Sequence, residues 1–597
     1  MCRIAGILNS GQPMYNIEDI VINMCNLQKH GGPDDSGIYN ATEDRLVLGN
    51  RRLSLLDLSN AGHMPMQYQD HYYITYNGEI YNYLELKREL TALGHHFTNH
   101  SDTEVILAAY SQWGSLSFSK LKGMFAFALW DNVEKELLLV RDAIGIKPIY
   151  YSTLSDNLFF ASELRAFNAI PQFHEQNKKW PIYMMAYGHI PEPVSTLKEV
   201  KPLHKGCFLK YDLKKRNYSI QSFAHFSYSN EILNRNEAIE NIKELLKDAV
   251  EEQLIADAPV AVFLSGGLDS GIIATIASTY KKENLNALSI YFEEKEYSEK
   301  KFQDLLIDKL ECNSYQLLLK EEEFHRSFPS ILESMDMPSC DGINTWFISK
   351  YAALNGFKAV LSGLGGDELF GGYPSFNRIA ATNLLQQLPD FAKGFGKRSS
   401  SKKLSRLSYL KIEGIKGIYL FLRGHFNPFE IARQLGAYEN EVWNTLNEMP
   451  TLLNVQHLEN KNKVSWMEFN LYMQNQLLRD ADVMSMIHGV EIRVPFLDNN
   501  LINYANKINP KVKYNGSFPK QFLIDTYVNQ LPREIWERPK MGFSFPFAKW
   551  MINSEYIKNT ISTNSEVLQY NYKKFMKGSL HWSQMMCLII LNHRKVL

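Results

Sequence analysis

The chain has 597 residues, enough for two or more domains with large hydrophobic cores. Its 64 Lys and Arg residues balance 65 Asp and Glu residues, so the net charge of −1 favours neither nucleic acid nor an acidic membrane as a partner. The six dispersed cysteines, with no C-x-x-C pair, argue against a disulfide framework or a zinc site. No apolar run reaches about 18 residues and no secretion signal opens the chain. We therefore expect a cytoplasmic protein that binds small molecules, with no nucleic-acid or membrane partner.

Short apolar strands interleaved with a few helices fill the chain up to about residue 170. Ser101 and Glu104 form a candidate capping box for a helix that Gly114 ends. This pattern predicts an α+β domain with antiparallel sheets. Residues 171–230 carry Pro, Gly and Lys irregularly, as a connection does. The strands are expected at residues 45–49, 72–78, 124–131, 136–142 and 157–162.

From about residue 231 the pattern alternates between helices and continuous apolar strands. It predicts a doubly wound parallel sheet, with helices at residues 238–254 and 269–282 and strands at 260–264, 287–292, 315–319 and 358–362. After about residue 373 the chain is expected to be mostly helical. The basic, serine-containing segment 393–406 is interpreted as a solvated surface loop.

The chain begins MCRIAGI, which places a cysteine directly after the initiating methionine. Removal of Met1 would give Cys2 both a thiol and a free α-amine. An amine with a reference pKa of about 7.7–8.0 is a plausible base for a thiol near 8.5, so Cys2 is a candidate nucleophile. The alternative is that Cys2 is a small buried residue in an edge strand.

Two glycine-rich turns follow predicted strands of the second region. In VAVFLSGGLDSG, Ser265, Gly266 and Gly267 stand at a strand-to-helix turn that favours phosphate, although the Walker spacing is absent. The second turn, LSGLGGDELFGGY, leads to Asp367. At the carboxyl ends of parallel strands, Asp269 and Asp367 would share a crevice and hold Mg²⁺ on a pyrophosphate. The alternative is that these acids only cap helices.

These motifs together resemble a known enzyme family. SGGLDS is similar to the pyrophosphate loop of ATP pyrophosphatases, and MCRIAGI, NGEIYN and GMFAFALWD resemble the class II glutaminase domain. Their order in one chain resembles the glutamine-hydrolysing asparagine synthetases. The resemblance implies an N-terminal αββα sandwich of the N-terminal nucleophile type, then an α/β domain with a doubly wound parallel sheet and a helical C-terminal extension. We expect residues 1–205 to hold the glutaminase domain with its connection, and residues 206–597 the synthetase domain.

The resemblance also implies an activity and a set of site residues. Glutamine would be hydrolysed in the first domain, and the second would use ATP and Mg²⁺ to form an acyl-adenylate that ammonia attacks. Catalytic roles fall on Cys2, on Asn77 and Gly78 as oxyanion donors, and on Lys540. Glutamine would be bound by Arg52, Glu79 and Asp102, although Asp102 could simply stabilise a helix start. ATP would be bound by Leu264, Ser265, Gly266, Gly267, Asp269, Ser270, Ile290, Ser362 and Gly363, and the metal by Asp269 and Asp367.

The sequence departs from the family pattern in several places. HGGPD has Gly31 where the family has an arginine that braces the glutaminase pocket, and Val483 replaces a residue that is basic in many relatives. In RDADVMSMIHGVEIRVPFLD, the residues Asp482, Glu491 and Arg493 remain open as site or scaffold. A homodimer is possible and is not decided by the sequence.

Leu364 is the largest departure, because the family usually has a glutamate there, close to the acyl-adenylate. The segment MPSCDGINTW also differs from the usual acceptor pocket. The acceptor is therefore either aspartate or another carboxylate, for example a sugar acid of a surface polysaccharide. A non-catalytic paralogue is disfavoured by the intact motifs, and a cyclising synthetase related to β-lactam formation is disfavoured by Cys2.

Overall fold

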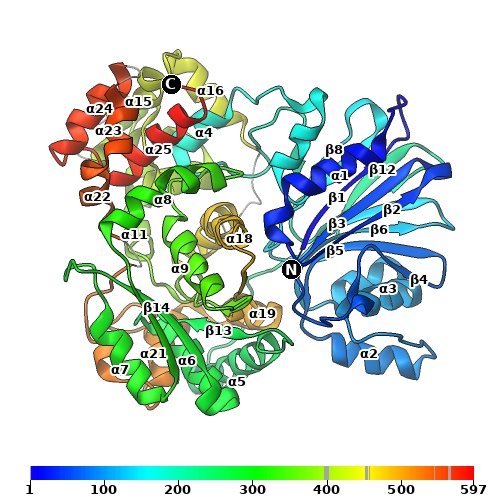
Figure 1. The fold of residues 1–597 in the computed structure, drawn as a ribbon. Coiled ribbons are helices and arrows are strands. Elements are labelled where there is room, and N and C mark those ends of the chain that lie inside the picture. The colour runs from blue at the N-terminus through cyan, green and yellow to red at the C-terminus, as the bar shows by residue number, and fades with distance from the viewer. Residues whose placement is uncertain (1, 395–401, 451–454, 456, 543–544, 563–565) are drawn as a thin grey trace.

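The computed structural model of the protein describes residues 2–394, 402–450, 455, 457–542, 545–562 and 566–597. Met1 and residues 395–401 of the basic segment 393–406 lie outside the described residues. Of the residues that flank this gap, Lys393 is buried and pairs with Asp390. Figure 1 shows a half rich in strands, in blue and cyan, beside a half in green to red that contains a sheet and many helices.

The N-terminal half is an αββα sandwich, as expected. Both six-stranded sheets are entirely antiparallel. The first has the order β10 (Lys201–Pro202), β8 (Tyr150–Ser152), β9 (Leu158–Ala161), β1 (Cys2–Leu8), β3 (Leu46–Arg52) and β2 (Asp35–Ala41). The second has the order β12 (Asn217–Ser222), β11 (Cys207–Asp212), β7 (Glu136–Arg141), β6 (Gly123–Asp131), β5 (Tyr72–Ile80) and β4 (Met66–Tyr68).

Side-chain alternation along β1 explains why the sheets stack. Ile4 and Leu8 belong to the core between the two sheets, together with Trp130, whereas Ile7 faces the opposite way and packs in a cluster with Val21. The outer helix α1 (Ile17–Leu27) contacts β1 and β3, and α2 (Tyr83–Ala92) and α3 (Asp102–Trp113) cover the other sheet. Since β1 lies between β9 and β3, Cys2 is not in an edge strand.

The predicted cap of α3 forms only in part. Ser101 accepts a hydrogen bond from the backbone N–H of Glu104, and Gly114 ends the helix with φ of 57°. The Glu104 carboxylate instead accepts from the backbone N–H groups of Thr98 and Asn99 at 2.9–3.0 Å. The acid therefore ties down the loop before the helix and does not return to the cap residue.

The connection crosses between the halves before the chain enters the second domain. Helix α4 (Trp180–Tyr187) packs against helices of the C-terminal extension, but β11 and β12 then return to pair in the N-terminal sheet next to β7. A boundary at 205/206 would separate these two strands from their sheet. We therefore correct the predicted boundary and propose that it lies at residues 223–234, between β12 and α5.

The C-terminal half contains the predicted doubly wound parallel sheet. Its order is β15 (Asn313–Leu318), β14 (Asn286–Tyr291), β13 (Val260–Phe263), β16 (Ala359–Leu361) and β17 (Glu491–Arg493). Strand order reverses between β13 and β16, so the loops that follow these strands open into one crevice. Its helices include α5 (Arg235–Gln253), α6 (Leu268–Lys281), α7 (Lys300–Leu310), α8 (Glu321–Ser334) and α9 (Ile343–Leu354). The three-residue β17 was not predicted.

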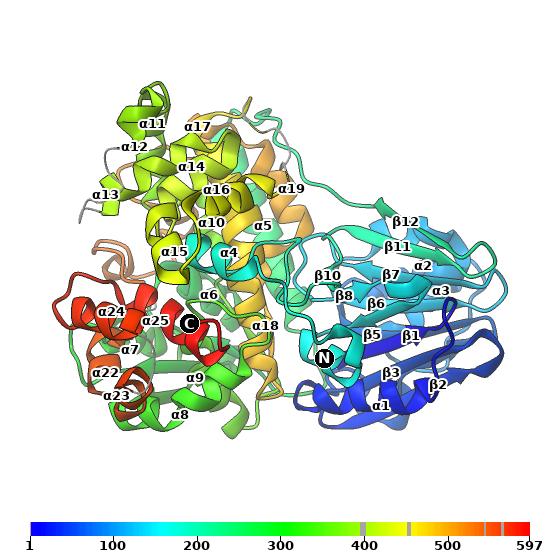
Figure 2. The same ribbon diagram turned by 90° about the horizontal axis from the view of Figure 1, so that it is seen from above.

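The rest of the chain is helical, as expected. A continuous helical run passes from α17 (Asn460–Met467) through a π-helical segment at Glu468–Leu477 into α18 (Leu478–Met486), which Figure 2 shows running beside the N-terminal half. The other helices are α10 (Gly366–Phe370), α11 (Ser375–Gln386), α12 (Asp390–Gly394), α13 (Lys402–Ser405), α14 (Gly414–Arg423), α15 (Pro428–Leu435), α16 (Glu439–Glu448), α19 (Asn499–Lys507), α20 (Pro510–Lys513), α21 (Gln521–Tyr527), α22 (Phe547–Asn553), α23 (Glu555–Ser562), α24 (Glu566–Met576) and α25 (Trp582–His593).

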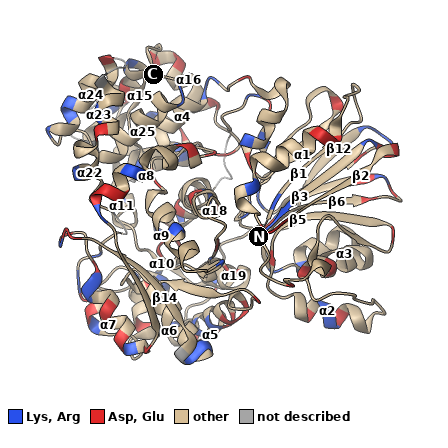
Figure 3. Cartoon of the chain, viewed as in Figure 1, with Lys and Arg blue, Asp and Glu red and all other residues tan. Residues whose placement is uncertain are grey.

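Basic and acidic residues are interspersed over both halves (Figure 3), in keeping with the balanced composition. Among the described residues, no helix has the length and apolar character that crossing a membrane requires.

Candidate active sites

Cys2 begins β1 with only 4% of its surface exposed. Its backbone N–H donates to Asn77 Oδ1 at 3.2 Å. Burial raises the pKa of the thiol, while the chain's amino terminus, the backbone N–H of Leu53 and the Arg52 guanidinium act in the opposite direction. The charge of Glu79 adds to the effect of burial, so the pKa of the thiol stays raised although the amino terminus and Arg52 favour the thiolate.

Asn77 is fully buried on β5, and its two side-chain atoms are in different situations. Oδ1 holds the Cys2 N–H, whereas Nδ2 has no hydrogen-bond partner among the described residues. An unmade buried donor costs about 1–3 kcal/mol. The following Gly78 lies against β6, where a Cβ atom would come within 2.2 Å of the Met124 carbonyl oxygen. Beside the thiol there is therefore an open amide donor and a backbone position without a side chain.

The three predicted glutamine-binding residues are all buried, but each already has partners. Arg52 donates to the backbone carbonyls of Leu56, Asp57 and Ser59, so its guanidinium is held by the loop that follows β3. The Oδ2 atom of Asp102 accepts from Tyr76 Oη at 2.8 Å and from the Ile80 N–H at 2.9 Å. These bonds fix Asp102 in the first turn of α3, which is the structural role that the sequence left open for it.

Glu79 points across to the synthetase half. Its Oε2 lies 3.7 Å from Arg493 Nη2, and Arg493 Nε pairs with Glu491 at 2.5 Å. Burial, and next the charge of Glu491, raise the pKa of Glu79 well above its usual range. The backbone carbonyl of Arg493 also accepts a hydrogen bond from the backbone N–H of Ser362 at 2.8 Å. Arg493 thereby contacts a predicted residue of each site, so it belongs to the scaffold between them.

The two glycine turns meet, as the topology predicted. Two glycines of the second turn pack against Asp269 of the first. A Cβ atom placed on Gly363 would lie 2.9 Å from the Cβ of Asp269, and one placed on Gly366 would lie 2.7 Å from the carboxyl carbon of Asp269. In the first turn, Ser265 and Ser270 share a hydrogen bond of 2.9 Å between their hydroxyl oxygens. A cavity of about 950 Å³ opens beside both turns, and it is lined by Leu264, Ser265, Gly267, Asp269, Ser270, Ile290, Ser362, Gly363, Asp367 and Lys540. Of the predicted ATP-binding residues, Gly266 alone is not in this lining; it has φ of 82°.

Asp269 and Asp367 are joined by a residue that the sequence did not reveal. Lys520 Nζ lies 2.6 Å from Asp269 Oδ2 and 2.7 Å from Asp367 Oδ1, and Lys540 Nζ lies 2.5 Å from Asp367 Oδ2. Burial alone would raise the pKa of Asp367, but the two lysines lower it to about 2. Lys520 stands alone in SFPKQF, and no motif around it indicates this role.

Several carboxyl groups line the large cavity, which Leu364 also lines. Asp341, Asp480 and Glu368 line it together with Leu364. Burial, and next the charge of Asp367, raise the pKa of Glu368 to about 8, and Tyr373 donates to its Oε1 at 2.6 Å. Burial also raises the pKa of Asp341 and of Asp480. Each of these three carboxyl groups therefore favours its neutral form.

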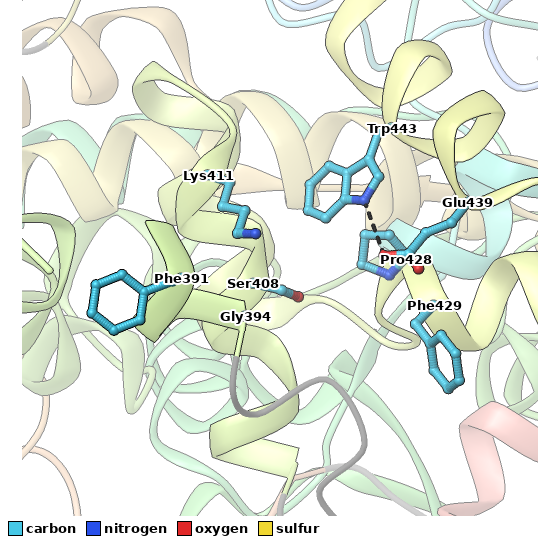
Figure 4. Close-up of a pocket in the computed structure, with 8 residues that line it drawn as sticks. All are labelled: Phe391, Gly394, Ser408, Lys411, Pro428, Phe429, Glu439 and Trp443. Atoms are coloured by element: carbon cyan, nitrogen blue, oxygen red, sulfur yellow. Dashed lines mark hydrogen bonds between the residues drawn. The ribbon is translucent and has the colours of Figure 1, made fainter. Parts of the chain in front are cut away.

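A smaller cavity of about 260 Å³ lies in the helical extension (Figure 4). Trp443 donates to Glu439 Oε1 at 3.4 Å at its wall. No predicted site residue lines it. The candidate sites thus remain the Cys2 site and the large cavity.

Comparison with known proteins agrees with both sites. Residues 1–224 match the family described as glutamine amidotransferase domain, and residues 241–584 match asparagine synthase. The chain is 30% identical to glutamine-hydrolyzing asparagine synthetase 1 of Bacillus subtilis (strain 168), over 96% of this chain and 92% of that protein. It is 28% identical to a putative glutamine-hydrolyzing asparagine synthetase of Mycobacterium tuberculosis (strain ATCC 25618 / H37Rv), over 90% and 85%. It is 25% identical to Amidase chry2 of Gibberella zeae, over 92% and 90%.

The asparagine synthase match alone covers more than half of the chain, and the Bacillus relative aligns along nearly all of it. The chain therefore belongs to the glutamine-hydrolysing asparagine synthetase family and is a carbon–nitrogen ligase of that type.

Proposed function

We propose that the protein transfers the amide nitrogen of glutamine to a carboxylate, which it activates with ATP as an acyl-adenylate. The observation that carries the proposal is the group of Asp269, Lys520, Asp367 and Lys540 at the meeting point of two glycine turns. Two cations and two anions in one cavity suit a magnesium-bound triphosphate.

In the glutaminase half, the Cys2 thiolate attacks the glutamine amide carbon. Asn77 Nδ2 is available for the developing oxyanion together with the Gly78 N–H, and the unpartnered state of Nδ2 supports this role. The α-amine left after Met1 removal delivers the proton to the departing ammonia, and water then hydrolyses the thioester to glutamate. Arg52 would face the substrate carboxylate, and Glu79 and Asp102 its ammonium group.

In the synthetase half, an oxygen of the acceptor carboxylate attacks the α-phosphorus of ATP and pyrophosphate leaves. Lys540 and Lys520 lie where they can balance the charge that develops on the phosphates. Ammonia then attacks the acyl carbon, a proton is lost, and AMP leaves as the amide forms.

The residues present fit a magnesium ion. Asp269 Oδ1 is buried and has no hydrogen-bond partner among the described residues. Mg²⁺ is commonly held by one or two carboxylates together with substrate phosphates, so a larger cluster of protein ligands is not required. Asp269 and Asp367 would hold the ion, which would supply positive charge to the phosphates of the bound nucleotide. Lys520, which sits between the two acids in this structure, would then be free to pair with phosphate.

The acceptor is either aspartate or a different carboxylate, and one observation favours the second. Leu364 lines the cavity at the position where the family pattern has a glutamate, and an alkyl side chain can neither take a proton nor contact ammonium. A bulkier acid, such as a sugar acid, is the alternative acceptor that we propose.

Pyrophosphate release tests the proposal. The protein would be assayed with ATP, Mg²⁺ and glutamine against a panel that contains aspartate, glutamate, uronic acids and aromatic acids. We expect pyrophosphate and glutamate to form together with at least one acid. If glutamate is released but no acid of the panel yields pyrophosphate in the presence of ATP and Mg²⁺, the ligase proposal is contradicted. Pyrophosphate release without glutamate release would contradict the glutaminase part.

A further inference from the structure

Arg3 follows the nucleophile directly and is fully buried. Its Nε lies 2.6 Å from Glu163 Oε1 in the same half, and its Nη2 lies 2.9 Å from Asp482 Oδ2 on α18 of the synthetase half. Lys147 pairs with the other oxygen of Asp482 at 3.1 Å. The residue next to Cys2 therefore forms a buried ion pair between the two halves.

Arg3 also occupies the space beside Gly31. A Cβ atom on Gly31 would lie 2.7 Å from Arg3 Cγ and 2.9 Å from its Nε, whereas its backbone is not in the left-handed region that favours glycine. The three atoms nearest to a Cβ at position 31 all belong to Arg3, so the Arg3 side chain blocks a larger residue there. His30, the neighbour of Gly31, contacts the same Glu163 oxygen as Arg3, at 2.9 Å.

The partner of Arg3 in the synthetase half is close to the large cavity along the same helix. Asp482 is two residues from Asp480, which lines the cavity and accepts from Ser339 Oγ at 2.7 Å with both oxygens. Removing one member of a buried charge pair leaves the other uncompensated, which is strongly destabilising. The backbone of Cys2 is thus held in a fixed position relative to α18.

We propose that Arg3 is a positioning residue: it supplies from position 3 the guanidinium that the family pattern places at position 31, and it couples the nucleophile strand to α18. The inference rests on the proposed function, since coupling means that ammonia released at Cys2 is used in the synthetase half.

The test is a cycle of Arg3→Ala, Gly31→Arg and the double variant, in the full-length protein. Arg3→Ala leaves Glu163 and Asp482 without their shared cation, and Gly31→Arg alone forces two guanidinium groups into one space. We expect each single variant to lower the thermal unfolding midpoint, and the double variant to recover most of the loss because one guanidinium again fills the space. Glutamate formed per pyrophosphate should rise from about one to several in Arg3→Ala and fall back in the double variant.

Two controls separate positioning from a general loss of structure. Arg165 pairs with Glu163 Oε2 at 2.7 Å and also contacts Asp336 of the synthetase half at 3.5 Å. Arg165→Ala therefore removes a different contact between the halves without touching Asp482 or Gly31, and it should leave the ratio near the parent value. Synthesis supported by ammonium should persist in Arg3→Ala. A double variant that is no more stable than the single variants would overturn the proposal that Arg3 supplies the guanidinium of position 31. This outcome can be read even if the protein has no glutaminase activity. An unchanged glutamate-to-pyrophosphate ratio in Arg3→Ala would overturn the coupling.

Discussion

Lys520 Nζ bridges Asp269 and Asp367, at 2.6 Å from one carboxylate and 2.7 Å from the other. Burial opposes its charge, but the two acids raise the pKa of Lys520 above its ordinary value. The lysine is therefore a fixed cation at the point where the two glycine turns meet. This arrangement connects the glycine-rich loop after β13 with the loop after β16.

Lys520→Met should abolish adenylation while leaving glutamine hydrolysis intact. Without the ammonium, Asp269 loses its ion-pair partner, Asp367 keeps only Lys540, and the phosphates lose a cation. Removal of one such stabilising group typically costs about 10²–10³-fold in rate. Pyrophosphate release and glutamate release, measured in the same samples, check this. Lys520→Arg is the matched control and should retain part of the pyrophosphate release. Full pyrophosphate release by Lys520→Met would show that the lysine is only a structural bridge.

Asp269→Asn and Asp367→Asn should each lose magnesium-dependent adenylation. Each substitution removes a carboxylate that would face the metal-bound pyrophosphate, and Asp367→Asn also leaves Lys540 without its ion-pair partner. Glutaminase activity is expected to change little, since both acids lie in the other half. The check is pyrophosphate release as a function of Mg²⁺ concentration, and a variant with the parent's rate at every concentration would identify its acid as a helix cap.

The two turns show what sequence patterns can predict about the synthetase site. Strand periodicity predicted the parallel sheet. The rule that ligands bind where strand order reverses then predicted that Asp269 and Asp367 lie in one crevice. Lys520 could not be found in this way, because it reaches the crevice from a turn about 150 residues after Asp367, and only the tertiary fold brings it there. Similarly, β17 is three residues long, too short for a periodic signal.

The glutaminase site shows a different limit. Motif resemblance pointed to Cys2 and Asn77 as candidates, but it did not reveal the hydrogen bonding of the Asn77 amide. Its Oδ1 accepts from the Cys2 N–H, whereas its Nδ2 has no hydrogen-bond partner among the described residues. In the sequence, Gly31 is a departure from the family pattern that bears on glutamine affinity and leaves the nucleophile in place. In the structure the Arg3 side chain lies beside Gly31, and the compensation that we propose links residues distant in sequence, which a motif read position by position cannot detect.

Asn77→Asp should lower glutamate release by about 10²–10³-fold, the typical cost of losing one oxyanion donor. Aspartate keeps an acceptor for the Cys2 N–H but has no N–H of its own, so the substitution removes the open donor and retains the contact. Cys2→Ala is the reference for complete loss, and ammonium-supported synthesis should continue in both variants. Steady-state glutamate release measures the effect. Parent-like hydrolysis by Asn77→Asp would assign the oxyanion to other donors, and parent-like hydrolysis by Cys2→Ala would make Cys2 structural.

Glu368→Gln should change how stability depends on pH. Glu368 has a pKa of about 8 in the folded protein against an ordinary value of 4.5, so the folded state holds an extra proton between these values. Stability from this group is full below about pH 4.5 and is lost as pH rises toward about 8, with a slope of at most about 1.4 kcal/mol per pH unit. The glutamine variant lacks this titration. Denaturant unfolding at several pH values should show the parent losing stability relative to Glu368→Gln across the window, and parallel curves would contradict the assignment.

We predict that Leu364 influences which acceptor the enzyme takes. A glutamate near an adenylated carboxylate can act as a general base on incoming ammonium, a contribution of typically about 10²–10⁴-fold, which an aspartate-specific enzyme is expected to keep. Leucine adds apolar surface to the cavity and leaves Asp341, which lines the same cavity, as the candidate base. We predict weak or absent pyrophosphate release with aspartate and stronger release with a larger carboxylate.

The variant Leu364→Glu tests this prediction directly, with Leu364→Gln as the matched control of similar shape and no charge. Because the rest of the acceptor pocket also differs from the family pattern, Leu364→Glu alone should bring little gain on aspartate, and it should weaken release with the larger acid by placing a charge against apolar surface. Asparagine and pyrophosphate are measured together for each variant. Robust glutamine-dependent asparagine formation by the unmodified chain, at about 1–10³ s⁻¹, would contradict the prediction and identify aspartate as the acceptor.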